Sequence, residues 1–518
     1  MFSKINTFGI SGARAFAIAV ETDIVRGIPS FEVVGLGNEA VRESRKRVRS
    51  AIINQGFPFP QGRITLNLAP AGQRKQGTSL DLPIAAGILM SMGVIPARSF
   101  PDCAMVGELS LDGSVRGVKG VLPMIVLGIK NGVRHFIVPA ENEEESLLAE
   151  ESVSVYPVKN LGEAVAVLKS SRDRNGNFAK GRTVKKCEPF KPCQWKTAWD
   201  FADVIGQEGA KRALEIAASG GHNVLMFGSA GCGKTMMARC LAGIMPPMSF
   251  DEAFAVSQIY SIAGITENGS ALIRERPFRA VHAGVTRSAL IGGGRPLSLG
   301  EVSLAHEGVL FIDEFSEVNR DAVEALRQPL EEKLVRIHHY GVSETIPANF
   351  MLVAAANPCP CGNLYEGGGR CTCSPLRIQN YLSRISVPIL DRIDIQTAVK
   401  RVKADMIGQR SGESSLTVRE RVIKAREIQT KRFQNEDFKV NAAISRNCLE
   451  KYCSVPSCTR QFLKEAIDRF GLSVRAYEKI LKVARTIADM AERDRISEED
   501  IAEALQYRCM ERQEAEAA

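Results

Sequence analysis

The sequence predicts an α/β protein with a parallel central sheet, a further α/β region before it and a helical region after it. Three short apolar runs, at 223–227, 308–312 and 350–356, have the length and composition of buried strands. Segments with helical spacing separate them, as a parallel sheet requires. After about residue 403, apolar residues recur almost entirely with helical spacing.

The composition is that of a globular protein without a membrane anchor. Hydrophobic residues make up 45% and charged residues 24% of the 518 residues, and the net charge is +8. At roughly 100–200 residues per domain, this length predicts about three or four domains. No apolar stretch reaches the roughly 18 residues of a membrane span. Residues 1–10 lack the pattern of a signal peptide, so we expect a cytoplasmic protein with no membrane partner.

The first region, residues 1–168, mixes strand-like and amphipathic segments, with strand patterns at 63–68 and 136–138. Residues 169–197 are polar and contain several glycines and prolines, which predicts a linker. Between Lys169 and Lys191 there are eight basic and two acidic residues. Such a stretch can bind nucleic acid, or it can be a solvated linker only.

The helical region, residues 404–518, contains one specific helix-start signal. Ser497 is followed three residues later by Asp500, the spacing of a capping box. Ile496 and Ile501 flank this pair at the spacing of a hydrophobic staple. We therefore expect the last helix to begin at Ser497.

A glycine-rich loop follows the first strand-like run and leads into a helical pattern at 236–242. It fits G-x-x-x-x-G-K-[ST] in a strand–loop–helix context, and its residues are Gly228, Ser229, Ala230, Gly231, Cys232, Gly233, Lys234 and Thr235. The glycines allow backbone N–H groups to surround phosphate oxygens. Lys234 can neutralise the β- and γ-phosphates, and Thr235 can offer its hydroxyl to Mg²⁺. The loop therefore predicts a site for ATP with Mg²⁺.

The other two strand-like runs end in side chains suited to phosphate hydrolysis. The second run ends in Asp313, which can hold Mg²⁺, and Glu314, which can polarise the attacking water as general base. We expect both carboxylates to be buried, at a cost that a metal or a partner must compensate. The third run ends at Asn357, whose amide can orient the water or sense the γ-phosphate. The alternative is that Asn357 is only a turn residue before Pro358.

Five motifs together carry a resemblance to a known family. They are Asp203–Gln207 (DVIGQ), the loop at Gly228–Thr235, Gly300–Glu314 (GEVSLAHEGVLFIDE), Ala355–Gly362 (AANPCPCG) and Tyr381–Asp394 (YLSRISVPILDRID). With them the chain resembles the magnesium-chelatase-like AAA+ family and, within it, the YifB/ComM branch. The resemblance extends over nearly the whole chain, because residues 33–37, 63–70 and 106–113 are similar to the N-terminal domain of that branch.

The resemblance implies four parts of the chain. Residues 1–168 would form a Lon-protease-like α/β domain with the S5-type fold, and residues 169–197 a basic linker. Residues 198–403 would form an AAA+ P-loop NTPase core that carries the cysteine loop described below, and residues 404–518 a C-terminal helical lid. It also implies ATP and Mg²⁺ as cofactors and a homo-oligomeric ring, hexameric in this family.

Individual residues acquire roles from the same resemblance. Ile205 would lie against the adenine. Arg392 matches the arginine finger that reaches the γ-phosphate of a neighbouring subunit, with Arg384 as the alternative. Arg475 matches the sensor arginine of the helical lid.

The Lon-like domain is expected to lack peptidase activity. Ser79 lies where Lon-type peptidases keep their serine. Ungapped counting puts the place of the dyad lysine at Leu122, and Lys119 is three residues away. A serine without its lysine base is a poor nucleophile.

Four cysteines are spaced as a candidate metal site. Cys359 and Cys361 are separated by nine residues from Cys371 and Cys373. Four thiolates gathered in this way can close a tetrahedral Zn²⁺ site, although C-x-C is tighter than the common C-x-x-C spacing. The alternative is four reduced thiols on a surface loop. His306 is expected to be a packed neighbour and not a metal ligand.

Three functions are compatible with these features. The resemblance favours a ring motor acting on single-stranded or branched DNA, a helicase that promotes branch migration in recombination during natural transformation. The basic segments at 42–49, 169–191 and 333–339 can supply phosphate contacts for it. The second function is a chelatase-type motor that remodels a protein partner. The third is an ATP-dependent protease, against which the missing lysine argues.

Overall fold

The chain is described by a computed structural model that covers 2–35, 39–70, 78–96, 100–146, 148, 153–171, 178–179, 198–265, 272–294, 297–339, 342–364, 370–402 and 412–508. It forms two compact units. The first comprises Met1–Lys191, Phe250–Ile273 and Arg295–Ser298, and the second Pro192–Ser249, Arg274–Gly294 and Leu299–Ala518. Each unit is therefore built from separate stretches of the chain.

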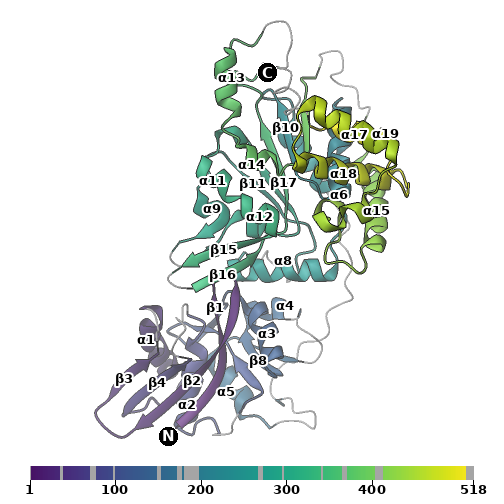
Figure 1. The fold of residues 1–518 in the computed structure, drawn as a ribbon. Helices are drawn as coiled ribbons and strands as arrows, with labels where there is room; N and C mark the ends of the chain where they lie inside the picture. Colours follow the sequence, from purple (N-terminus) through teal and green to yellow (C-terminus); the bar gives the residue numbers. More distant parts are fainter. Residues whose placement is uncertain are drawn as a thin grey trace. The chain divides into compact units, whose positions relative to one another are not determined.

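A seven-stranded mixed sheet forms the centre of the first unit (Figure 1), with the strand order β3-β4-β2-β1-β5-β8-β9. Strand β2 runs antiparallel to both β1 and β4, and the other neighbours are parallel. The strands are β1 (Phe2–Ser11), β2 (Arg14–Val25), β3 (Ser30–Val34), β4 (Arg63–Ala69), β5 (Cys103–Met105), β8 (His135–Pro139) and β9 (Ser154–Val158), with a small ribbon of β6 (Glu108–Leu109) and β7 (Val115–Arg116). The strands expected at 63–68 and 136–138 are confirmed as β4 and β8.

The core of the first unit lies between this sheet and its helices. In β4, Ile64, Leu66 and Leu68 are buried while their neighbours are not, which is the period-two pattern of a strand covered on one face. The helices are α1 (Glu39–Asn54), α2 (Asp81–Ser91), α3 (Val121–Lys130), α4 (Glu143–Ser146) and α5 (Leu161–Lys169). Every residue of α2 is buried, as expected for a helix whose sequence is apolar from Leu82 to Met90.

Part of the segment expected to be a linker contributes to this core. The side chain of Phe178 is 3% exposed. Its ring meets Tyr156 and His135 edge-on, and its N–H donates to the Tyr156 hydroxyl at 3.1 Å. Residues 172–177 and 180–197, the rest of that basic segment beyond Lys169–Ser171, lie outside the described residues.

Helix α8 (Phe250–Ala263) belongs to the first unit, although it follows the glycine-rich loop in the sequence. It packs against α3. The Ser261 carbonyl accepts the Gly120 N–H at 3.0 Å, and the Ala263 carbonyl accepts the Lys119 ammonium at 3.4 Å. The chain therefore leaves the second unit after residue 249 and returns to it by residue 274.

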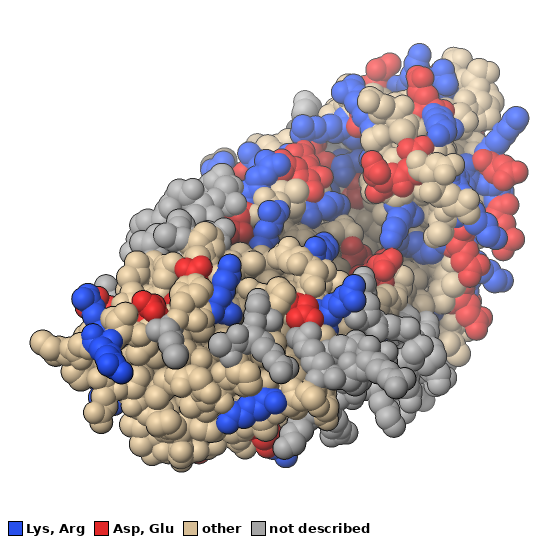
Figure 2. Space-filling view, turned by 90° about the horizontal axis from the view of Figure 1, so that it is seen from below, with Lys and Arg blue, Asp and Glu red and all other residues tan. Residues whose placement is uncertain are grey.

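The surface of the first unit seen in Figure 2 is largely uncharged. Lys and Arg side chains stand there singly or in small groups, with a few acidic side chains between them. On this face, the described residues do not form a continuous basic surface of the kind that duplex DNA requires.

The second unit is centred on a five-stranded, fully parallel sheet with the order β11-β14-β17-β10-β18. The strands are β11 (Phe278–Val281), β14 (Val309–Ile312), β17 (Met351–Ala356), β10 (Val224–Gly228) and β18 (Ile395–Val399). The three strands expected from the apolar runs are β10, β14 and β17. They are buried on both faces and lie side by side, so the polar residues at their carboxyl ends meet at one edge.

Helices cover both faces of this sheet (Figure 1). The helices of this unit before the C-terminal region are α6 (Glu208–Gly220), α7 (Lys234–Ile244), α9 (Arg287–Ile291), α10 (Glu301–Leu304), α11 (Arg320–Ala325), α12 (Arg327–Glu332), α13 (Pro375–Leu382) and α14 (Val387–Leu390). The remaining strands are short or form a hairpin: β12 (Gly292–Gly293), β13 (Ser298–Leu299), β15 (Leu334–His339) and β16 (Val342–Pro347). The antiparallel β15–β16 hairpin comes between β14 and β17 in the sequence and is not part of the five-stranded sheet.

The C-terminal region is helical, as expected, with α15 (Ser415–Arg432), α16 (Leu449–Tyr452), α17 (Ser457–Phe470), α18 (Val474–Met490) and α19 (Glu498–Gln506). These helices share one continuous apolar core with α6, α7 and the sheet. The last helix begins at Ser497 with both hydrogen bonds of the capping box to Asp500, and Ile496 and Ile501 are buried. The predicted α/β fold with a parallel sheet and a C-terminal helical region is thus confirmed. Within the described part of the chain, no helix combines the length and apolar character needed to cross a bilayer.

Candidate nucleotide-binding and hydrolysis site

The glycine-rich loop joins β10 to α7 as the motif predicts. Gly231 and Gly233 have φ values of 78° and 94°, in the left-handed region that favours glycine. A Cβ on Gly228 would lie 2.4 Å from the Val399 carbonyl oxygen, so a larger residue cannot occupy this position. Helix α7 begins at Lys234. Its free N–H groups and the positive end of its dipole make the loop suited to hold phosphate.

Lys234 lies among oxygen atoms of the site. Its ammonium donates to the carbonyls of Gly228 at 2.6 Å and Ser229 at 3.0 Å, and to the Asn357 side-chain oxygen at 3.1 Å. Its side chain is largely buried, and this burial lowers its pKa. Asp313 and Glu314 oppose that shift by their negative charge. A triphosphate would add negative charge beside the ammonium and favour its charged form further.

Asp313 and Thr235 meet at the edge of the sheet. The Thr235 hydroxyl donates to Asp313 Oδ2 at 3.0 Å. A hydroxyl and a carboxylate at this separation fit the ligands that Mg²⁺ takes in P-loop enzymes. The residues present therefore fit both a triphosphate, through the loop and Lys234, and its metal ion.

Glu314 is less buried than expected. The prediction that both carboxylates are buried is wrong, because Asp313 is half-buried and Glu314 is exposed. Strand β14 ends at Ile312, so the two side chains stand beyond the edge of the sheet. Glu314 has φ 49°, a left-handed conformation that is unusual for glutamate, and its N–H donates to Asp313 Oδ1 at 2.9 Å. This exposure leaves the carboxylate accessible to water.

Ile205, expected against the adenine, is half-buried in the loop before α6. Two residues later, Gln207 bonds both backbone groups of Lys400, just after β18: its side-chain oxygen accepts the Lys400 N–H at 3.2 Å, and its amide nitrogen donates to the Lys400 carbonyl. Gln207 itself has φ 64°. The loop that carries Ile205 is thus attached to β18.

Arg392, expected as the arginine finger, lies just before β18. Its guanidinium donates to Glu331 Oε1 and to the Pro388 carbonyl, both at 2.5 Å, and its side chain is 13% exposed. The alternative, Arg384, pairs with Glu317 at 2.6 Å and is 54% exposed. Arg392 must therefore exchange Glu331 for phosphate oxygens if it is to act on a neighbouring subunit.

Arg475 is the second residue of α18, and its side chain is 57% exposed. It lies 3.6 Å from Asp391, the residue next to Arg392. The structure thus places the expected sensor arginine beside the residue that precedes the expected finger. Lys234, Thr235, Asp313 and Asn357 form a separate set connected by the hydrogen bonds described above.

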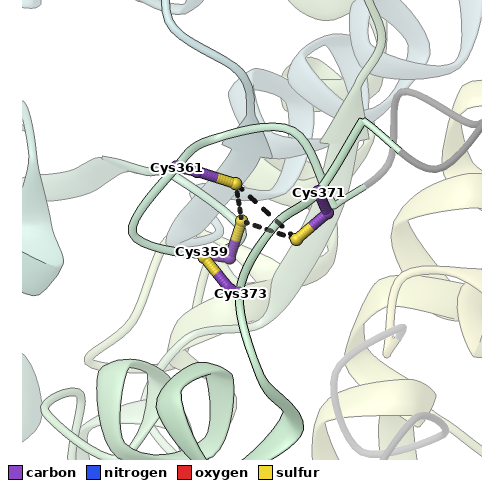
Figure 3. A group of neighbouring side chains, drawn as sticks. All are labelled: Cys359, Cys361, Cys371 and Cys373. Atoms are coloured by element: carbon purple, nitrogen blue, oxygen red, sulfur yellow. Dashed lines mark hydrogen bonds between the residues drawn. The ribbon is translucent and has the colours of Figure 1, made fainter.

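The four cysteines come together, and they are the one group of three or more potential ligands found among the described residues (Figure 3). All four sulfur atoms lie within 4.8 Å of one another, and Cys359 Sγ is 3.3 Å from Cys361 Sγ. Backbone N–H groups of Asn363 and Thr372 lower the pKa of Cys361 to about 6. The structure thus favours the thiolate that a zinc ion requires at this position.

The cysteine loop also touches the nucleotide loop. It starts two residues after Asn357, and a Cβ on Gly362 would lie 3.8 Å from the backbone nitrogen of Ala230. A metal held there would therefore stabilise chain on one side of the phosphate site.

Of the two positions that align with the catalytic serine and lysine of Lon-type peptidases, the first holds a serine and the second does not hold a lysine. Ser79 is buried, and the register position of the lysine is the buried Leu122. Lys119 is exposed, and its ammonium bonds the Ala263 carbonyl. His306, as expected, is structural, since its Nδ1 accepts the N–H of Asn349 at 3.0 Å.

A buried polar cluster around Asp394, two residues after Arg392, was not identified from the sequence. Asp394 is 5% exposed and pairs with Lys479, and it lies 3.6 Å from His222 Nδ1. These partners hold the pKa of Asp394 well below its usual range, while burial lowers the pKa of His222. The only signal in the sequence is an aspartate at the start of a buried strand pattern, which does not reveal a partner 85 residues away.

Three family models match long stretches of the chain. The family described as "Magnesium chelatase, subunit ChlI" matches residues 200–407. "Subunit ChlI of Mg-chelatase" matches residues 20–142, and "Magnesium chelatase, subunit ChlI C-terminal" matches residues 412–508.

Two relatives match over nearly the full length of the chain, and a third matches over part of it. The chain is 39% identical to YifB of Salmonella typhimurium over 511 residues, which are 98% of this chain and 97% of that protein. It is 40% identical to the competence protein ComM of Haemophilus influenzae over 504 residues, 97% and 96% of the two chains. The magnesium-chelatase 67 kDa subunit of Chlorobaculum parvum is 29% identical over 172 residues, 30% of this chain and 23% of that one. The chain therefore belongs to the magnesium-chelatase-like family of AAA+ ATPases.

Proposed function

We propose that this ATPase is a cytoplasmic, hexameric ring motor that acts on DNA as a ComM-like helicase and promotes branch migration during natural transformation. The observation that carries the proposal is the similarity to the competence protein ComM, which extends over 97% of this chain. The alignment with the magnesium-chelatase 67 kDa subunit of Chlorobaculum parvum extends over 30% of this chain.

The hydrolysis step follows from the side chains at the sheet edge. The phosphate loop and Lys234 would bind the triphosphate, and Thr235 with Asp313 would hold Mg²⁺, which would supply positive charge to the phosphate oxygens. Glu314 orients and polarises the attacking water, and Asn357 lies beside Lys234 where it can detect the γ-phosphate. In the ring, Arg392 of the next subunit supplies the remaining positive charge, with Arg475 beside it.

For DNA contact we favour the β15–β16 hairpin. It stands outside the five-stranded sheet and carries Arg336, whose side chain is 48% exposed and pairs with Glu332 at 3.0 Å. A loose surface pair of this kind exchanges readily for a phosphate, since exposed ion pairs contribute only about 0–1 kcal/mol. The hairpin immediately precedes β17, so a DNA contact there is connected to Asn357 through one strand.

The test is hydrolysis and branch migration on defined DNA. Purified protein is given ATP with three-way junctions, forked duplexes or no DNA, with Glu314→Gln as the inactive control and the exposed Glu420→Gln as the matched control. DNA should stimulate ATPase activity, and the junction should be resolved only with hydrolysable ATP. An ATPase rate that DNA does not change and that an added protein partner increases would favour the alternative, a chelatase-type remodelling motor.

Two further properties belong to this proposal. The cysteine cluster binds one Zn²⁺ as a structural site, supported by four sulfur atoms within 4.8 Å. The N-terminal domain has no peptidase activity, because the register position of the lysine base is Leu122. Digestion of casein that is abolished by Ser79→Ala would overturn the second statement.

A further inference from the structure

Two aspartates flank Arg392, and both pair with basic residues of α18. Asp391 lies 3.6 Å from Arg475, and Asp394 pairs with Lys479. Residues four apart on a helix lie one above the other on the same face. One face of α18 therefore holds the chain on both sides of the finger residue.

The inner pair, Asp394 with Lys479, is the stronger of the two. Asp394 is 5% exposed and Lys479 is 18% exposed. The second carboxylate oxygen of Asp394 accepts the Asn223 N–H at 3.0 Å and faces His222. A buried carboxylate deprived of its cation leaves an uncompensated charge, which is costly. The cluster therefore fixes Asp394, and with it the chain two residues after Arg392.

Asn223 connects the same segment to the strands of the catalytic site. Its side-chain amide donates to the Arg392 carbonyl at 3.1 Å, and its side-chain oxygen accepts the Leu352 N–H at 2.9 Å. Its own carbonyl accepts the N–H groups of Asp394 and Ile395. Residue 223 precedes β10, which ends at the phosphate loop, and Leu352 lies on β17, which ends at Asn357. The backbone of the finger is thus fixed to both strands.

We propose that Lys479 is a positioning residue for Arg392: through Asp394 it connects helix α18 to the finger and sets how the guanidinium reaches the neighbouring subunit. This inference rests on the proposed role of Arg392 in trans. Because α18 also carries Arg475, a shift of this helix in one subunit changes the charge presented to the nucleotide of the next. The connection gives the ring a route for passing a conformational change between subunits.

Complementation between subunits tests the inference. Lys479→Met keeps the length of the side chain and removes its charge. It should bind ATP like the parent and form rings, while hydrolysis falls by about 10²-fold, the loss typical of a misplaced catalytic group. Mixing with Lys234→Ala protein should restore part of the activity, since some interfaces then combine an intact loop with a correctly held finger. Lys479→Arg should retain much of the parent activity, and the exposed Lys424→Met is the matched control.

Two combined variants make the result decisive. Adding Lys479→Met to Arg392→Ala should cause no further loss, because both act on one group. The pair Lys479→Met with Asp394→Asn removes the negative charge that the single variant would leave buried without its cation, so it should fold even if the single variant does not, with the same defect in trans. Parent-like hydrolysis by this pair would overturn this inference alone. So would a loss of hydrolysis that mixing with Lys234→Ala protein does not relieve, when the same mixing relieves the loss in Arg392→Ala. If Arg392→Ala is not relieved either, the role of the finger in trans fails first and this inference fails with it.

Discussion

The Lys234 ammonium lies 3.1 Å from the side-chain oxygen of Asn357, and this contact joins the phosphate loop to the end of the neighbouring strand β17. The same ammonium bonds two carbonyls of its own loop. A single lysine therefore connects the group that binds phosphate with the group proposed to detect it.

Lys234→Ala should abolish nucleotide binding or turnover. A hydrogen bond to a charged group contributes about 1.5–3 kcal/mol, so loss of one such bond weakens binding roughly 10- to 100-fold. Fluorescent ATP titration measures the affinity, and the exposed Lys424→Ala is the control. Parent-like ATP affinity together with parent-like turnover in Lys234→Ala would show that the loop does not depend on its cation.

Glu314→Gln should bind ATP but not hydrolyse it, and should accumulate as assembled rings with ATP bound. Loss of a general base costs roughly 10²–10⁴-fold in rate. Single-turnover hydrolysis separates this effect from binding, with Glu420→Gln as the control. Turnover at the parent rate would remove Glu314 from the general-base role.

Arg392→Ala should keep the ATP affinity of each subunit and lose hydrolysis by on the order of 10³–10⁵-fold, as expected for an arginine finger. Mixing it with Lys234→Ala should restore part of the activity, because some interfaces then combine an intact loop with an intact finger. Arg495→Ala, at an exposed position of the second unit, is the control. Rings that form and exchange subunits without any recovery would favour Arg384 or a purely structural role for Arg392.

Purified, reduced protein should contain about one zinc per chain if the four thiolates close one tetrahedral site. Cys361→Ser should lose the metal, and the exposed Cys458→Ser should keep it. Because the cysteine loop contacts the phosphate loop at Gly362 and Ala230, ATPase activity should fall with the metal. Elemental analysis that finds no zinc in the parent protein contradicts the metal site directly.

The buried Glu145 predicts a pH-dependent stability of the first unit. Burial raises its pKa to about 7, against the opposing hydrogen bonds from Ser261 and the N–H groups of Leu122 and Val121. The folded protein holds the proton more tightly than the unfolded chain, whose carboxyl has a pKa of about 4.5. The free energy of unfolding therefore falls as the pH rises from about 4.5 to about 7, by at most about 1.4 kcal/mol per pH unit, and levels off above that range.

Glu145→Gln should flatten this dependence. Hydrogen exchange of α3 measured between pH 5 and pH 8 gives the local free energy of opening in both proteins. An unchanged slope in the Glu145→Gln protein would assign the pH dependence to another group.

The arrangement of the candidate nucleotide site was predictable because its information is local. Gly228–Thr235 and the strand ends at Asp313 and Asn357 are short segments whose residue types and spacing already specify the chemistry. Parallel strands then bring those ends together without any long-range information. The exposure of Glu314 was not predictable, since it depends on where β14 stops and on a left-handed backbone turn.

The surroundings of Arg392 could not be predicted for a different reason. Arg392 pairs with Glu331, which is 61 positions away in the sequence, and Asp394 pairs with Lys479, which is 85 positions away. Only tertiary packing determines such pairs. Phe178 shows the same limit, because a polar neighbourhood suggested a linker while the aromatic ring packs into the core of the first unit.

Residues 250–273 belong to the first unit, although they follow a stretch of the second unit in the sequence. A protease that cuts once between the two sheets, near residue 190, would not release two independent fragments, because the C-terminal fragment would still carry α8. A truncated protein beginning near residue 198 would carry α8 without α3, the helix against which α8 packs. Such a fragment should aggregate unless it is supplied with the N-terminal part. Addition of the separately expressed N-terminal part should restore its solubility.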